Sequence, residues 1–430
     1  MDINYLIIIF VLIGCMSCYI PVFMCLFFTA VVGFILTGKP ILFLFDSFFL
    51  SMDKFALVVV LFFILCGNIM TAGNIVKKLI KVANALVSWL PGGLGMAAII
   101  ACGLFGAISG STVATVVALG GFMIPALIEN GYDEQYTLGL MTTSPNLGVI
   151  IPPSIGMILY SMISNVSLEG LFLTGFVPGF LIIFGTCLYT FLIFRKNTKI
   201  IRKPVPSFSE VLKVLKDGFW SLMLPVIIFG GIFSGAFTAN EAAVVACVYA
   251  FFVELFIHKS IKFSDVKSIT VNSAVTSATL LIIVAGATCF GRYLTFEDIP
   301  GQITEAVLQS IQSPVVFLFA INVLLLVIGM FMDIISATLI LGPVFLPMLD
   351  AFNIDPLHFG LIMTVNLAIG YCTPPMGVSL YITGAIGKRD LIFVSKAVVP
   401  FLIIQIFVLI LITYLPEVIL SLPKMMGFVY

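Results

Sequence analysis

Apolar residues fill long stretches of this chain, and polar residues fall mainly between them. A helix needs about 20 apolar residues to cross the hydrocarbon core of a bilayer. The pattern predicts membrane helices over Phe55–Met70, Leu171–Phe194, Trp220–Ser234, Ala242–Ile257, Ser273–Phe290, Val315–Phe331 and Leu391–Leu415. We therefore expect an all-α polytopic membrane protein. Three further stretches are amphipathic and predict arms in the membrane interface: Asn74–Leu90, Phe208–Lys216 and Phe263–Thr270.

Two apolar stretches, at 146–153 and 366–375, are interrupted by a Pro-Pro pair that follows an asparagine. A further proline follows each pair at the same spacing, at Pro178 and Pro400. Proline breaks a helix because it lacks the backbone N–H. Broken backbone at membrane depth is tolerated where it is buried in protein or lines a cavity. Matching breaks in two halves are typical of secondary transporters that bind their cargo there.

The alternative is that the prolines, with nearby Gly and Ser residues, only permit tight helix packing. Either break alone fits both interpretations. Because the breaks are repeated in two halves with similar polar neighbours, the pattern favours a binding site.

Each break follows a Gly- and Ser-rich apolar segment that is too irregular for one membrane helix. We expect re-entrant hairpins at about 105–125 and about 329–347, with tips that close on the breaks. An odd number of crossings between the halves would invert their topology. The expected organisation is scaffold helices and an arm over 1–90, a first transport half over 91–195, a basic loop with scaffold helices and an arm over 196–300, a second transport half over 301–415, and a tail over 416–430.

Composition supports a membrane location. Hydrophobic residues make up 61% of the chain and charged residues 9%, whereas a soluble domain has about 25% charged residues. With 20 basic and 20 acidic residues, the chain shows no sign of a nucleic-acid partner. The longest polar stretch is basic, which places it in the cytoplasm. Its basic residues are Arg195, Lys196, Lys199, Arg202, Lys203, Lys213 and Lys216.

Neutral oxygen donors gather at both breaks and both predicted hairpin tips. Alkali cations prefer carbonyl, hydroxyl and amide oxygens, and helix C-termini turn partial negative charge toward them. Helix N-termini turn partial positive charge toward a carboxylate. The candidate donors are Ser109, Ser111, Thr112, Ser144, Asn146 and Ser154 in the first half, and Asp333, Ser336, Asn366 and Thr373 in the second.

Charged residues at membrane depth are weaker candidates. Glu241 begins a span, where it serves the site or completes a helix cap. Arg292 ends a span, where it snorkels to the interface or pairs with an acidic substrate. Asp333 belongs to the site or caps the second hairpin helix. The chain has no GxSxG motif and no metal-binding histidine spacing, so we do not expect an enzyme.

Four blocks of sequence carry a family resemblance. They are Gly106-Ala-Ile-Ser109-Gly-Ser111-Thr-Val-Ala-Thr, Ser144-Pro-Asn-Leu-Gly-Val-Ile-Ile-Pro152-Pro153-Ser, Gly235-Ala-Phe-Thr-Ala-Asn-Glu241-Ala-Ala and Asn366-Leu-Ala-Ile-Gly370-Tyr-Cys-Thr373-Pro-Pro-Met376-Gly. In these blocks and their order the chain resembles, over residues 5–415, the large membrane subunit of TRAP (tripartite ATP-independent periplasmic) transporters.

The resemblance implies an elevator-type transporter of the bacterial cytoplasmic membrane, with two inverted-topology repeats that slide against a scaffold. It implies coupling to two or more Na⁺ ions and import of an organic acid of the sialic acid or C4-dicarboxylate class. The implied partners are a small four-helix membrane subunit, expected here as a separate chain, and a periplasmic substrate-binding protein.

Carried over by position, the resemblance implies two sodium sites formed largely by backbone carbonyls. One uses Ser109, Asn146, Gly148, Ile151 and Pro153, and the other uses Gly329, Gly370, Thr373 and Met376. The implied substrate-binding candidates are Ser111, Thr112, Ser154, Asp333, Ser336 and Asn366. The two tips differ in sequence, so we expect the sodium sites to differ in detail.

Three alternatives stay open. A stand-alone sodium/carboxylate symporter would transport without a binding protein. A passive channel is disfavoured because hairpins that close on a midplane site occlude it. An intramembrane enzyme would need nucleophile and base pairs that the sequence does not show.

Overall fold

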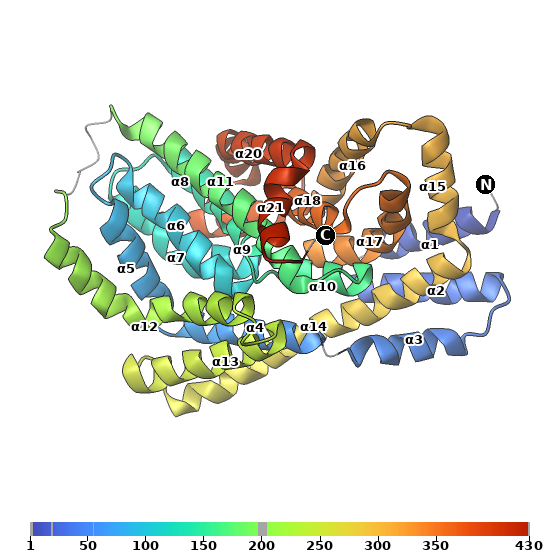
Figure 1. The fold of residues 1–430 in the computed structure, drawn as a ribbon, viewed down its shortest axis with the longest axis horizontal. Helices are drawn as coiled ribbons and strands as arrows, with labels where there is room; N and C mark the ends of the chain where they lie inside the picture. The colour runs from blue at the N-terminus through green and yellow to red at the C-terminus, as the bar shows by residue number, and fades with distance from the viewer. Residues whose placement is uncertain (1–2, 19, 55, 197–203, 429–430) are drawn as a thin grey trace.

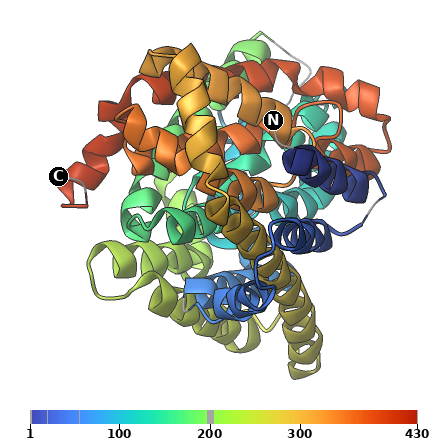
Figure 2. The ribbon, with the colours of Figure 1, turned by 90° about the vertical axis from the view of Figure 1, so that its right-hand side faces the viewer.

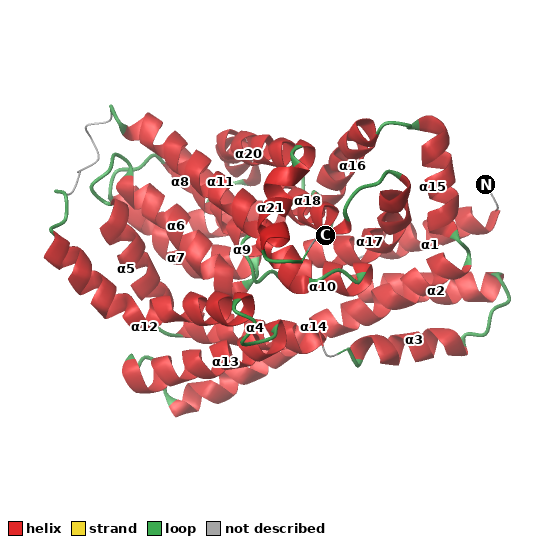
Figure 3. Cartoon of the chain, in the orientation of Figure 1, coloured by secondary structure: helices red, strands yellow, loops and turns green. Residues whose placement is uncertain are grey.

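The computed structural model describes residues 3–18, 20–54, 56–196 and 204–428, and the regular structure in these ranges is helical (Figure 3). Seven of the described helices are long and apolar enough to cross a membrane. The number rises to eight if the bent pair α3 (Leu42–Met52) and α4 (Ala56–Ala72) forms one span. The all-α polytopic prediction is therefore confirmed. Within the predicted basic loop, Lys199, Arg202 and Lys203 lie outside the described residues.

Further helices lie outside the two predicted transport halves, and the last of them overlaps the start of the second half. Their bounds are α1 (Ile3–Ser17), α2 (Val22–Leu36), α5 (Ile75–Val87), α12 (Phe208–Phe233), α13 (Ala239–Phe252) with a π-helical turn η2 (Val253–Ile257), α14 (Phe263–Phe296) and α15 (Ile299–Ser310). In Figure 1, α2–α4 and α12–α14 run along the lower side, and Figure 2 shows the same arrangement from one end. The long α14 packs against α2, α3 and α4, so it ties this side together.

The two predicted transport halves follow the same order of elements, with one exception. The first consists of α6 (Gly93–Ser109), α7 (Thr112–Glu129), α8 (Glu134–Thr143), a 3₁₀ turn η1 (Ser144–Asn146), α9 (Leu147–Ile150), α10 (Ile155–Ser164) and α11 (Leu168–Phe194). The second consists of α16 (Pro314–Gly329), α17 (Ile334–Ala351), α18 (Pro356–Gly370), α19 (Val378–Gly387) and α20 (Leu391–Tyr414). In the second half the single helix α18 takes the place of α8, η1 and α9.

The halves exchange contacts with each other. Helix α7 of the first hairpin packs against α19, which follows the second break, and α17 of the second hairpin packs against α10, which follows the first break. Helices α8 and α20 also pack together. Because each half completes the packing of the other, the two form one interleaved body.

Both Pro-Pro pairs break helices, as predicted. The chain leaves helical geometry between α9 and α10 and again between α18 and α19, and the Pro152–Pro153 and Pro374–Pro375 peptide bonds are cis. Helix α10 restarts after Ser154, whose hydroxyl accepts a hydrogen bond from the Met157 N–H at 3.4 Å. This N-cap satisfies a backbone donor that the break would otherwise leave without a partner.

The hairpins are longer than predicted. Their arms α6–α7 and α16–α17 extend over 93–129 and 314–351, whereas the sequence indicated about 105–125 and about 329–347. The Gly and Pro residues inside these segments weaken a helix, but neighbouring helices hold it. Tertiary packing therefore overrides the local propensity.

Two of the three predicted arms are not separate helices. Residues 75–87 form α5, but 208–216 and 263–270 are the first turns of the continuous helices α12 and α14. In α12, Ser207 and Glu210 form a capping box that starts the helix ahead of the amphipathic stretch, and the helix then continues into the span. The predicted tail also contains a helix, α21 (Pro416–Met425), which packs against α11.

Candidate functional site

The first hairpin tip lies against the first break. Gly110, between α6 and α7, has φ of +61°, in the left-handed region that favours glycine. A Cβ atom at Gly110 would lie only 2.9 Å from the Pro153 carbonyl oxygen. The Ile155 N–H donates to the Gly110 carbonyl at 3.4 Å. The tip is thus joined directly to the backbone that follows the prolines.

Neutral oxygens converge where this tip meets Gly148. The hydroxyl oxygens of Ser109 and Thr115 are 3.2 Å apart, and the Thr115 hydroxyl donates to the Ser111 carbonyl at 2.8 Å. A Cβ atom on Gly148 would lie 2.9 Å from the Thr115 hydroxyl oxygen and 3.1 Å from the Ser111 carbonyl oxygen. Hydroxyl and carbonyl oxygens with no charged group among them suit an alkali cation.

Pairs of glycines seat each hairpin on its break. A Cβ atom at Gly106 would lie 2.4 Å from the Gly148 Cα, and one at Gly370 would lie 2.6 Å from the Gly329 Cα. A side chain at any of these glycines would force the backbone of the hairpin away from the backbone of the break. Gly148 and Gly370 also occupy matching positions when Pro152 is aligned with Pro374. The same backbone contact therefore occurs in both halves.

The second break has a different environment. The Thr373 hydroxyl donates to the Ile369 carbonyl at 2.8 Å. A Cβ atom at Gly377 would lie 2.7 Å from the Tyr371 carbonyl oxygen and 2.9 Å from that of Thr373, so both carbonyls turn toward Gly377. The Met376 side chain is 51% exposed. Carbonyl oxygens are again available, but this break reaches the surface of the chain.

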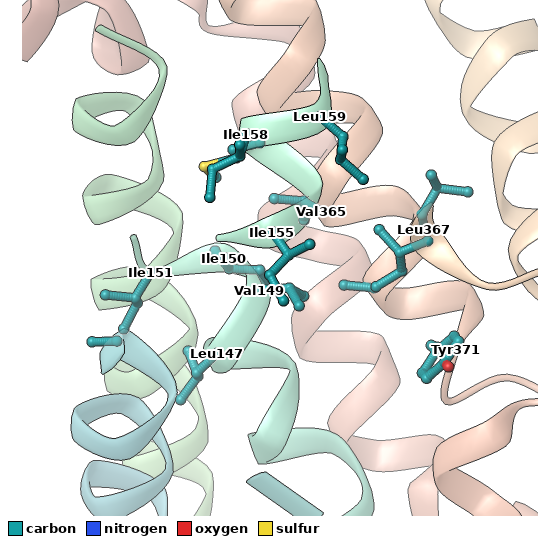
Figure 4. Close-up of a cluster of buried hydrophobic side chains, with 14 of the residues drawn as sticks. Leu147, Val149, Ile150, Ile151, Ile155, Ile158, Leu159, Val365, Leu367 and Tyr371 are labelled. Carbon is teal, nitrogen blue, oxygen red and sulfur yellow. The ribbon is translucent and has the colours of Figure 1, made fainter. Parts of the chain in front are cut away.

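A cavity of about 110 Å³ joins both tips and both breaks. Figure 4 shows the buried apolar cluster to which the lining residues Val149, Ile155 and Tyr371 belong. The lining residues are Gly110, Ser111, Thr112, Val113, Val149, Ile155, Gly156, Asp333, Ile334, Ile335 and Tyr371.

Three helix N-termini point partial positive charge toward this cavity. Helices α7, α10 and α17 begin beside it, and their N-cap residues Ser111, Ser154 and Asp333 each accept a hydrogen bond from the backbone N–H three residues on. The N-cap therefore satisfies one donor of each first turn, and the others attract an anion. Asp333 is the charged residue in the described lining, so the helix N-termini provide the positive potential there.

Thr112 lines the cavity and carries a hydroxyl without a hydrogen-bond partner among the described residues. Its side chain is 2% exposed. A buried hydroxyl without a partner costs about 1–3 kcal/mol. The Ser336 hydroxyl, on α17, is equally unpartnered within the described part of the chain but does not line the cavity. A bound polar ligand would satisfy Thr112.

The two asparagines are not equivalent, contrary to the parallel that the sequence suggested. The Asn146 amide donates to the Gln405 side chain at 3.0 Å, whereas the Asn366 amide donates to the Asn322 carbonyl, also at 3.0 Å. With the prolines aligned, Asn366 matches Ser144 rather than Asn146. The Asn146 amide therefore reaches a helix of the other half, whereas the Asn366 amide bonds within its own half.

The remaining predicted charges lie away from the cavity lining. Glu241 forms a capping box with Thr238 at the start of α13, and it accepts the Thr238 N–H at 2.8 Å. The Arg292 guanidinium lies 4.9 Å from the centre of the Phe296 ring. The capping box matches the structural alternative raised for Glu241, whereas both alternatives for Arg292 stay predictions. Ile151 ends α9 and donates its N–H to the Leu147 carbonyl at 2.8 Å.

Several site residues were not predicted from the sequence. Thr115 belongs to the block that begins at Gly106. Its spacing from the other hydroxyl residues of that block is the sequence signal that could have identified it. Gln405 stands alone in the apolar run of α20, and a lone amide at membrane depth is itself a signal. Tyr371, Val149 and Ile335 gave no sequence signal, because only the fold brings apolar residues to a cavity wall.

The fold and site define a multi-pass membrane permease whose two similar halves meet at a cavity with both apolar and polar lining residues. Residues 7–418 match the family described as "Tripartite ATP-independent periplasmic transporter, DctM component". The chain belongs to this family: it is a large permease component of a TRAP transporter. This is a bacterial family of membrane transporters and not of enzymes.

Individual relatives cover nearly the whole chain. The C4-dicarboxylate TRAP transporter large permease protein DctM of Rhodobacter capsulatus is 37% identical, over 92% of this chain and 92% of that protein. The sialic acid TRAP transporter large permease protein SiaM of Vibrio cholerae is 34% identical, over 96% and 97%. The isethionate TRAP transporter permease protein DctMQ of Oleidesulfovibrio alaskensis is 36% identical over 86% of this chain, which spans 58% of that longer protein.

A solved structure shares the fold. The YdaH transporter of Alcanivorax borkumensis superposes with a TM-score of 0.64 over 87% of this chain and 88% of that chain, at 15% identity.

Proposed function

We propose that the chain imports an organic acid across the bacterial cytoplasmic membrane by sodium-coupled secondary active transport. The cavity formed by both hairpin tips and both breaks carries the proposal. A substrate there touches every irregular segment of the two halves at once. Binding at that point favours one arrangement of the tips over another, as alternating access requires.

The cavity suits a carboxylate. The N-termini of α7 and α10 supply positive potential, and the Thr112 hydroxyl supplies a donor. The N-terminus of α17 does not add to this potential, because Asp333 brings negative charge there. Relatives named for C4-dicarboxylates and for sialic acid support these two substrate classes. A larger groove of about 660 Å³, between α1, α14 and α15, is lined almost entirely by apolar residues and offers no comparable anion site.

Sodium acts as the coupling cargo at both breaks. In the first half the proposed ligands are Ser109, Gly148, Ile151 and Pro153, with Asn146 holding the turn before them. In the second half they are Gly329, Gly370, Thr373 and Met376. Ions at both sites lower the free energy of the loaded transport body, which then moves as a unit against α2–α4 and α12–α14.

The transporter works with a small membrane subunit and a periplasmic binding protein. The DctMQ relative supports the first partner, because this chain spans only 58% of that protein. The family description supports the second, since it names a tripartite periplasmic transporter. A stand-alone symporter is the competing function, and it would not need the binding protein.

Uptake into liposomes tests the proposal. The permease complex is reconstituted, and uptake of labelled sialic acid and of a labelled C4-dicarboxylate is measured with and without a sodium gradient and with and without the binding protein. We expect uptake of one substrate class that needs both. Uptake without sodium would contradict the coupling, and uptake without the binding protein would establish the stand-alone symporter.

Thr112→Val tests the cavity itself. The change keeps the side-chain shape and removes the hydroxyl, so we expect the substrate concentration for half-maximal uptake to rise about tenfold. Thr29→Val is the matched control, because Thr29 is fully buried in α2 and donates only to the Cys25 carbonyl of its own helix. Equal effects of the two substitutions would remove the cavity from the mechanism.

A further inference from the structure

A buried polar network connects the two breaks. The Cys372 thiol, in the second break, lies 3.3 Å from the Asn146 side-chain oxygen and 3.1 Å from the Thr142 carbonyl oxygen, both at the first break. The Gln405 amide of α20 donates to the Thr143 carbonyl at 3.0 Å and accepts from the Asn146 amide. Cys372 and Asn146 are fully buried, and Gln405 is 1% exposed.

The network bonds to carbonyls of the turn that leads into the first break. After α8 the chain tightens into the 3₁₀ turn η1, and the Leu147 N–H turns to the carbonyls of Ser144 and Pro145. The Thr143 carbonyl therefore loses the helical donor four residues on, and Gln405 replaces it. Residues of the second half thus fix the backbone immediately before Gly148.

The network is not repeated symmetrically in the two halves. With the prolines aligned, Cys372 matches Ile150 and Gln405 matches Ile183 in the first half. Isoleucine cannot make the reciprocal hydrogen bonds. The asymmetry argues against a packing device that the repeat simply copied, because the first half has no polar side chain at the positions that match Cys372 and Gln405.

We propose that Cys372 and Gln405 are positioning residues that couple the two sodium sites, an inference that rests on the proposed function. Cys372 lies between Gly370 and Thr373 of the second site, and its bonding partner Asn146 precedes Gly148 of the first. A change of backbone at the second break therefore moves the carbonyl oxygens of the first. Sodium at one site raises the affinity of the other, and the effect is reciprocal.

Direct sodium binding tests the coupling. Binding of radioactive sodium to the immobilised permease complex is measured by scintillation proximity, with choline keeping the ionic strength constant. We expect the wild type to bind with a Hill coefficient above one. In Cys372→Ala and in Gln405→Met the coefficient falls to about one, and the half-saturating sodium concentration rises roughly fivefold or more. Cys372→Ser restores a donor and should keep the wild-type curve.

Cys66→Ala is the matched control, because Cys66 is an equally buried thiol in α4 without a hydrogen-bond partner among the described residues. If Cys372→Ala and Gln405→Met lower the unfolding temperature but keep the wild-type Hill coefficient, the network is only structural and the inference is overturned. If Cys372→Ala does not fold, Gln405→Met decides by the same measurement.

Two wild-type results separate this inference from the proposed function. Saturable sodium binding with a Hill coefficient of one would overturn the coupling and leave sodium-driven transport intact. The absence of any saturable sodium binding would overturn both.

Discussion

The first and second breaks carry similar sequences but lie in different surroundings. Residues 151–160 are all buried, and the two-residue tip at Gly110 packs against Pro153 and Ile155. At the second break Pro375 and Met376 are exposed, and the tip between α16 and α17 is longer, with Phe331 56% exposed. Duplication of a sequence block therefore did not duplicate its environment.

The difference separates two tasks that the repeated motif does not distinguish. At the first break, hydroxyls and carbonyls are held in fixed positions by the close Gly106–Gly148 contact and by bonds from the second half. The second break is exposed at the surface of the chain, and contacts with side chains fix fewer of its oxygens. The following predictions test how far this contrast extends, from the largest expected effect to the smallest.

Glycine substitutions should damage both breaks, and the first more severely. We expect Gly106→Ala to cost about 1–3 kcal/mol of stability, because its Cβ would collide with backbone that cannot move cheaply. Gly329→Ala should cost less, since its Cβ would lie 3.1 Å from the Gly370 Cα. Unfolding temperature and sodium-driven uptake check both. Gly121→Ala is the control, because nothing lies within 4 Å of its Cβ position; a comparable loss there would refute the backbone-contact explanation.

Removal of hydroxyls should affect sodium dependence more at the first break. We expect Ser109→Ala to raise the sodium concentration for half-maximal uptake about tenfold, because a ligand is lost from a site that is already rigid. Thr373→Val should raise it only about threefold, since the surrounding carbonyls remain and can adjust. Ser161→Ala, a buried hydroxyl that bonds only to its own helix, serves as the control. A larger effect from Thr373→Val would reverse the assignment of the more rigid site.

Removal of the polar contacts at the starts of α8 and α18 should give the smallest effects. Tyr160 is fully buried and donates to the Pro356 carbonyl at 2.9 Å, so Tyr160→Phe should cost about 1 kcal/mol at any salt concentration. Arg389 makes a two-pronged ion pair with Glu134 at 2.8 and 2.6 Å, but both side chains are solvent-accessible. Arg389→Ala should therefore lower the unfolding temperature less, and only at low salt. Thermal unfolding at two salt concentrations separates the cases.

Much of the fold could be predicted from the sequence, because membrane helices and proline breaks are local properties. The breaks at Pro152 and Pro374 follow from the missing N–H of proline, and the spans follow from apolar length. Helix ends were less predictable: the hairpin arms extend through Gly and Pro residues that propensity disfavours. The start of α12 at Phe208 was predicted, but its continuation from the amphipathic stretch into the span was not.

The site could be predicted only in part. Ser111, Thr112 and Asp333 were candidates, and the structure places all three at the cavity between the tips. Asn146 and Asn366 looked like a matching pair, but their amides bond to different helices. Side-chain partners far away in the chain, such as Gln405, cannot be read from spacing.

The sequence by itself determined that this is a membrane protein of two similar halves, each with a broken helix, because hydrophobic length and proline act within a few residues. The tertiary structure decided which oxygens meet. It set Gly148 against Gly106, joined Cys372 to Asn146 and made one break buried and the other exposed. Those contacts depend on how helices far apart in the chain pack, and the repeated motif carries no record of that packing.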